Sequence, residues 1–226
     1  KPESNKVNRP LKNINYMGVN FRLGVGFNSP KLSVGNDWTA TSGFPYYFGF
    51  GYSFAIKNSW AFDLQITEEL ASYEVSNKGP FFKTNYMTTG AEVGIKKTFA
   101  KKPDDTFFFR AAFGYNFLII ANKTGATEYF NYSTSASGSN MYALPEIGYQ
   151  LRLADARHII NFSMNYKYSL STIATTQMNF FNTGSTAELN TLEMKGSYPG
   201  INVSYVYLIK GFEDNTRTGI KVDSHF

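Results

Sequence analysis

The sequence predicts an all-β chain that folds as an eight-stranded antiparallel up-and-down transmembrane β-barrel. Three observations support this fold class. Apolar and polar residues alternate with a period of two in eight segments, the connections between these segments alternate between long and short, and the composition is rich in aromatic residues but poor in charge. A period of two places successive side chains on opposite faces of a strand.

The composition limits how such a chain could enter a membrane. Aromatic and charged residues each make up 17% of the 226 residues, and the charged share is well below the roughly 25% that is usual in soluble domains. Yet no apolar run approaches the roughly 18 to 20 residues that a membrane-spanning helix requires. If the chain spans a membrane, we therefore expect it to do so with strands.

Each predicted strand carries its apolar side chains at one parity. In the stretch HIINFSMNYKYSLS, for example, the even positions from Ile160 to Leu170 are apolar and the odd positions from Asn161 to Ser169 are polar. The strands are, in chain order, 15–27 (odd), 44–55 (even), 60–70 (even), 85–97 (odd), 106–120 (odd), 140–153 (odd), 158–171 (even) and 195–210 (odd), with the apolar parity in parentheses.

The connections indicate how these strands are arranged. Long connections alternate with the short ones KNS, FAKKPDD and ADAR, and the long ones cover 28–43, 71–83, 121–139 and 171–192. In an up-and-down sheet this pattern puts all long loops at one end, and all short turns and both termini at the other. Bacterial outer-membrane barrels have this asymmetry, with long extracellular loops and short periplasmic turns. We expect a periplasmic segment at 1–14, the barrel at 15–210 and a periplasmic tail at 211–226.

The polar face decides which side of the sheet points inward. A soluble eight-stranded barrel of the lipocalin kind would turn its apolar face inside. Here the polar face combines glycines with four acids and five bases, a near balance that suits an interior ion-pair network, whereas the aromatic volume of the other face is too large for the interior. We therefore predict lipid outside, and inside the ion-pairing residues Arg22, Asp63, Glu69, Glu92, Lys96, Arg110, Glu146, Arg152 and Lys167.

Catalytic, metal-binding and cofactor chemistry finds little support in the sequence. There is no cysteine, and the two histidines, His158 and His225, both fall at the short-turn end, away from the outer leaflet where a lipid-modifying enzyme would act. No group of residues has metal-ligand spacing, and mid-strand GVG and GFG do not open a helix as phosphate-binding loops do. The net charge of +5 comes without a nucleic-acid-binding motif.

The strands of residues 15–210, with the glycine-punctuated first strand YMGVNFRLGVGFN and many Tyr and Asn residues, resemble the small outer-membrane barrels of the OmpX and OmpA transmembrane type. More specifically, the chain is similar to the PorT-like β-barrel proteins common in Bacteroidota. The resemblance implies a Gram-negative outer membrane and roles that include secretion accessory proteins and adhesins. The chain departs from OmpA because only GFEDNTRTGIKVDSHF follows the last predicted strand.

The function expected from these observations is that of a non-enzymatic accessory or interaction subunit of an outer-membrane complex, such as secretion or biogenesis machinery. A stand-alone OmpX-like envelope or adhesion protein is the alternative, and a lipid-modifying enzyme is disfavoured. The expected partners are outer-membrane lipid and a protein, with no nucleic acid, metal or cofactor. Candidate partner contacts are four loop phenylalanines and a basic rim at the short-turn end: Phe81, Phe82, Phe180, Phe181, Arg9, Lys12, Lys101, Lys102, Arg157 and Arg217.

Overall fold

The computed structural model describes residues 14–27, 32–35, 38–56, 59–76, 81–99, 105–119, 123–127, 130–153, 157–180 and 189–213. All regular structure in these residues is β-strand. No helix in the described part of the chain is long and apolar enough to cross a membrane.

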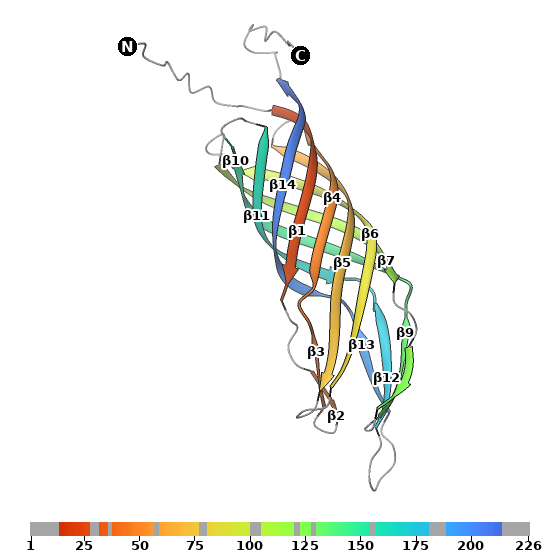
Figure 1. The fold of residues 1–226 in the computed structure, drawn as a ribbon. Coiled ribbons are helices and arrows are strands. Elements are labelled where there is room, and N and C mark those ends of the chain that lie inside the picture. Colours follow the sequence, from red (N-terminus) through yellow and green to blue (C-terminus); the bar gives the residue numbers. More distant parts are fainter. Residues whose placement is uncertain are drawn as a thin grey trace, which may run out of the picture.

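Eight long strands form a closed antiparallel barrel, as the sequence predicts (Figure 1). They are β1 (Ile14–Gly26), β4 (Tyr46–Ile56), β5 (Trp60–Ser76), β6 (Phe81–Phe99), β7 (Asp105–Ile119), β10 (Ser139–Arg152), β11 (His158–Ser169) and β14 (Tyr198–Glu213). Each strand pairs with its chain neighbours in the barrel, and the last strand closes on the first, with Phe21 opposite Tyr205. Closure leaves no free strand edge within the lipid-facing band, which a membrane requires.

The alternation of the sequence becomes the two faces of the barrel wall. Outward-facing apolar side chains are exposed, and Ile66, Phe113 and Met164 retain 64%, 67% and 64% of their accessible surface. Inward-facing polar side chains are buried, and Glu92 retains 0%. The band of exposed aromatic and aliphatic side chains runs around all eight strands, so the surface that would be insoluble in water is the one that faces lipid.

The long connections, which the sequence predicts to be loops, contain strands. The barrel strands β5 and β6 continue beyond the ends of their neighbours, and β2 (Leu32–Gly35) and β3 (Trp38–Ser42) add to the far end of β5. A separate four-stranded sheet has the order β13-β12-β9-β8 and consists of β8 (Lys123–Ala126), β9 (Phe130–Ala136), β12 (Ala174–Phe180) and β13 (Leu189–Met194). Figure 1 shows both sheets projecting together from one end of the barrel; we call this body the extension.

The extension has an ordinary apolar core between its two sheets. Val75 on β5, Phe130 on β9 and Met178 on β12 are at most 1% exposed and belong to one buried cluster. The same cluster also contains Tyr86, Ile173, Leu192 and Met194. The outer faces of the extension strands carry residues such as Asn131, Ser133 and Gln177, which are exposed and polar. The extension is therefore built like a small soluble domain, with the apolar side in and the polar side out.

Strand β5 passes from one environment to the other without changing its inner face. Its odd positions point inward throughout, and they are polar from Asp63 to Glu69 but apolar from Ala71 to Val75. Its outer face changes in the opposite sense, from Ile66 and Leu70 to Ser72 and Glu74. Both faces change between residues 69 and 72, which places the boundary between lipid and water at this level of the barrel.

Candidate functional site

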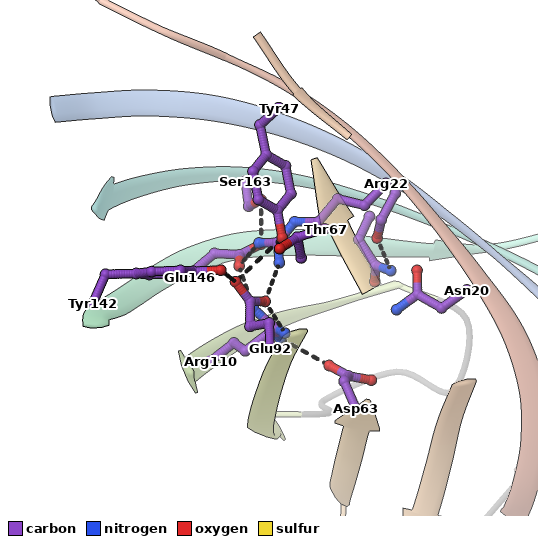
Figure 2. Close-up of polar contacts among 12 residues, drawn as sticks. Asn20, Arg22, Tyr47, Asp63, Thr67, Glu92, Arg110, Tyr142, Glu146 and Ser163 are labelled. Atoms are coloured by element: carbon purple, nitrogen blue, oxygen red, sulfur yellow. Dashed lines mark hydrogen bonds and ion pairs between the residues drawn. The ribbon is translucent and has the colours of Figure 1, made fainter. Parts of the chain in front are cut away.

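Five charged side chains from five strands meet in the barrel interior (Figure 2). Arg110 Nη2 lies 2.6 Å from Glu92 Oε1, Arg110 Nε lies 2.8 Å from Asp63 Oδ2, and Arg110 Nη1 lies 3.3 Å from Glu146 Oε2. Arg22 Nη1 lies 3.1 Å from the same Glu92 oxygen, and Arg22 also pairs with Glu146. All five residues are at most 5% exposed. We call this group the central network.

Hydroxyl groups donate further hydrogen bonds to the three carboxylates. Tyr47 Oη and Tyr142 Oη donate hydrogen bonds of 3.2 and 3.0 Å to Glu92 Oε2. Ser53 donates to Asp63, and Ser163 donates to Glu146. Each buried carboxylate thus accepts bonds from both guanidinium and hydroxyl donors, which is what keeps buried charges tolerable in a dry interior.

A second ion pair lies one layer toward the extension. Lys167 on β11 pairs with Glu69 on β5, and Tyr198 Oη donates a 3.1 Å hydrogen bond to Glu69 Oε2. Lys167 Nζ also lies 4.5 Å from the centre of the Tyr142 ring and 5.7 Å from that of Tyr198, distances suited to cation–π attraction. Because Tyr142 also bonds Glu92, this ring links the second pair to the central network.

Two glycines make room for the long interior side chains. A Cβ atom at Gly94 would lie 2.6 Å from Arg110 Nη2, and one at Gly114 would lie 2.1 Å from Tyr142 Cζ. Both distances are too short for real contacts, so any larger residue would displace the arginine or the tyrosine. These glycines belong to the polar parity of their strands, where the missing side chain creates space for a neighbour on the next strand.

The structure buries eight of the nine residues that the sequence analysis placed in the interior. Of the nine predicted residues, seven form the ion pairs described above. Lys96 is buried beside a neutral partner, donating a 3.1 Å hydrogen bond to Gln150 Oε1. Arg152 is half-buried in the last position of β10, toward the short-connection end.

The predicted partner contacts are less fully described. Phe82 is half-buried against the extension core, with its ring centre 4.3 Å from that of Tyr132, so it packs within the protein. Phe81 and Phe180 lie in β6 and β12, with side chains outside the described set. Arg157 is exposed beside the start of β11. The remaining predicted contacts, Phe181, Arg9, Lys12, Lys101, Lys102 and Arg217, lie outside the described residues.

Sequence reasoning missed three functional side chains of the interior: Tyr47, Tyr142 and Tyr198, whose hydroxyls bond the acids. A signal for them was present. Each tyrosine occupies the polar parity of its strand, so its phenol group had to point inward although its ring resembles those of the lipid-facing band.

The central network blocks the interior at its own level. The cavity beside Arg22, Asp63 and Arg110 has a volume of about 10 Å³, which is about the volume that one water molecule requires. His158 contacts Tyr205 at the barrel surface and lies at the start of β11. Among the described residues, no three His, Asp or Glu side chains gather in a way that could hold a metal ion.

Comparisons with known proteins agree with this geometry at the level of the fold. No protein-family model matches the sequence, and no curated protein sequence matches it. A crystal structure of the outer membrane protein OprG from Pseudomonas aeruginosa covers 88% of this chain and 96% of that chain, with a TM-score of 0.55 and 7% identity. Two autotransporter barrels align with lower TM-scores. The alignment with the transport unit of the autotransporter AIDA-I from Escherichia coli covers 92% of this chain and 93% of that chain, with a TM-score of 0.34 and 8% identity. The alignment with the β domain of the Bordetella autotransporter BrkA covers 86% of this chain and 100% of that chain, with a TM-score of 0.33 and 10% identity.

The fold, the exposed apolar band and the charged interior define the chain as an integral outer-membrane β-barrel protein. At 7% identity, the likeness to OprG shows the fold alone.

Proposed function

We propose that the chain is a non-enzymatic accessory subunit of an outer-membrane assembly, such as secretion or biogenesis machinery, and that it acts by binding another protein. The observation that carries this proposal is the extension. Instead of leaving all of its long connections as open loops, the chain builds two packed sheets outside the lipid band, with a core that includes Val75, Phe130 and Met178. A packed body projecting from a barrel whose interior is filled by side chains suits recognition better than transport.

The proposed orientation follows the asymmetry of the connections. The extension lies outside the cell, and the short connections, the start of β1 and the end of β14 lie in the periplasm. The chain has no cysteine, so orientation can be tested with single-cysteine variants labelled on intact cells by a membrane-impermeant maleimide. Ser133→Cys in the extension should be labelled, and Arg157→Cys only after the outer membrane is permeabilised. The reverse pattern would reject the orientation.

Two surfaces are candidates for the protein partner. One is the polar outer face of the four-stranded sheet, including Asn131 and Gln177, which are exposed. The other is the basic rim at the short-connection end, of which Arg157 is the described member. The resemblance to PorT-like proteins of Bacteroidota favours a partner in a secretion assembly.

Co-purification from native membranes in a mild detergent tests the proposal. The intact chain should retain one protein in a fixed ratio. The double variant Asn131→Arg with Gln177→Arg should lose it if the extension is the contact, whereas deletion of residues 214–226 or Arg157→Glu should lose it if the periplasmic rim is. A matched control, Glu74→Arg on the other sheet, changes charge without touching either surface. If no protein co-purifies in a fixed ratio with the intact chain, the stand-alone envelope or adhesion role replaces the accessory role.

A further inference from the structure

A cavity of about 720 Å³ lies where the extension joins the barrel. Its walls come from the inner faces of β5 and β6, the end of β11, the bend at 170–172 and the segment 193–197 that leads into β14. This volume falls within the range of roughly 300–1,000 Å³ that is typical of small-molecule sites. By contrast, the cavities at the level of the charged interior have volumes of about 10 Å³.

The lining of this cavity is aromatic and rich in hydroxyl groups. Five of its residues are tyrosines, and five are serines or threonines. Glu193 and Lys195 bring one negative and one positive charge, so the cavity has no excess charge that would select a phosphate or another ion. It has too many hydroxyl groups for a purely apolar ligand such as an acyl chain. A tyrosine offers a flat apolar ring and a polar tip, and hydroxyls both donate and accept hydrogen bonds.

These properties match a saccharide. A sugar ring has a patch of C–H groups on each face, which packs on an aromatic ring, and a rim of hydroxyls, which needs donors and acceptors in equal measure. The volume of about 720 Å³ would hold an oligosaccharide of a few units.

The position of the tyrosines shows where such a ligand would enter. Tyr73, Tyr86 and Tyr198 are buried on the inner side of the cavity, at 7–8% exposure. Tyr166 and Tyr168 belong to the outward parity of β11 and are 46% and 55% exposed. The cavity therefore reaches from the interior of the extension over the rim of the barrel to the lipid-facing side. Outward tyrosines at the barrel rim mark the level of the lipid headgroups.

We propose that this cavity binds the saccharide part of an outer-leaflet glycolipid, with the sugar inside the cavity and the acyl chains outside the barrel wall. The glycolipid source rests on the proposed orientation of the extension, whereas saccharide binding itself does not. The site is independent of a protein partner, and the absence of a partner would leave it intact.

The test uses the purified full chain and two probes. Rough lipopolysaccharide is the glycolipid probe, with retained adducts measured by native mass spectrometry. Its lipid-free core oligosaccharide, released by mild acid, is the free-sugar probe, with binding measured by saturation-transfer NMR. The variants are Tyr166→Ala with Tyr168→Ala, which removes the outer rings, and Thr172→Trp, which fills the cavity and retains them. Tyr115→Ala is the matched control, because Tyr115 is an outward tyrosine on β7 that does not line the cavity.

Wild type and Tyr115→Ala should retain lipopolysaccharide, and both cavity variants should bind it at least tenfold more weakly. If the free oligosaccharide shows the same pattern, a free saccharide is the ligand class; if only lipopolysaccharide does, the glycolipid is. Equal binding by wild type and both cavity variants, or no binding of either probe to wild type, would overturn the proposal. Each variant must show the heat-dependent gel shift of a folded barrel, and Thr172→Trp serves as the test if the double tyrosine variant does not fold.

Discussion

Replacement of Arg110 by alanine should destabilise the barrel more than any other single substitution in its wall. Arg110 is 3% exposed and contacts three carboxylates, those of Asp63, Glu92 and Glu146. The central network contains two arginines and three acids, a formal charge of −1, and loss of Arg110 leaves one arginine against three acids, a charge of −2. Asp63 would lose its direct ion pair and keep the hydrogen bond from Ser53.

The size of the stability loss in Arg110→Ala follows from the burial of the central network. Removing one partner of a buried, hydrogen-bonded ion pair costs about 3–5 kcal/mol, because the remaining charge is left uncompensated. Arg110→Lys should cost less, about 1–3 kcal/mol, because lysine keeps the charge but not the planar five-donor geometry. Lys83→Ala, an exposed cation in the extension, is the control and should change stability by less than about 0.5 kcal/mol.

Urea unfolding in phospholipid vesicles, followed by far-ultraviolet circular dichroism and by the heat-dependent gel shift, measures these differences. Adding Asp63→Asn to Arg110→Ala should recover part of the loss, since it removes one of the uncompensated charges. If Arg110→Ala does not fold, Arg110→Lys and the double variant still test the reasoning. An Arg110→Ala barrel within about 1 kcal/mol of the Lys83→Ala control would refute the role assigned to the central network.

Three further predictions follow from the same structure. In planar bilayers the protein should show no steady, large conductance, because the interior of an eight-stranded barrel is filled by side chains. The cavity beside the central network has a volume of only about 10 Å³. A stable, large single-channel current would contradict this prediction. Gly114→Ala should destabilise the barrel by about 1–3 kcal/mol through the clash with Tyr142. Tyr142→Phe removes only the hydroxyl group that bonds Glu92, so its urea unfolding measures how much of that destabilisation the loss of this hydrogen bond can explain. Phe130→Ala should destabilise the extension core by about 3–5 kcal/mol through lost packing. Hydrogen exchange should therefore accelerate in β9 and β12, while the heat-dependent gel shift of the barrel persists. Loss of the gel shift would show that the extension and the barrel do not unfold separately.

The barrel strands could be predicted from sequence because each is long enough to show several periods of two. The apolar parity of β11, from Ile160 to Tyr168, also indicates which residues face lipid. The same parity identifies interior charges such as Arg110 and Glu92, because side chains at the polar positions of a closed barrel wall point into the interior.

The extension could not be recognised in this way. Its added strands are 4–7 residues long, too short for a clear period, and Ser, Thr and Asn occupy many of their positions. On β5 the apolar residues move from the even positions, ending at Leu70, to the odd positions from Ala71 to Val75. That change of parity resembles the end of a strand, but the structure shows one continuous strand that passes from lipid to water. The change itself is the signal that a reading of the sequence could have used.

The apolar face of the barrel contacts lipid up to a level near Leu70, and the inner face contacts neither lipid nor bulk water. Spin labels on single cysteines along β5, from Trp60 to Ser76, in vesicles test it most directly, since the native chain has no cysteine to remove. Labels at Leu64, Ile66 and Leu70 should collide with dissolved oxygen and be shielded from a water-soluble nickel complex. Labels at Ser72 and Glu74 should collide with the nickel complex. A label at Gln65 should be shielded from both. Nickel accessibility at Leu64 and Ile66 equal to that at Glu74, or the absence of any alternation, would contradict the account.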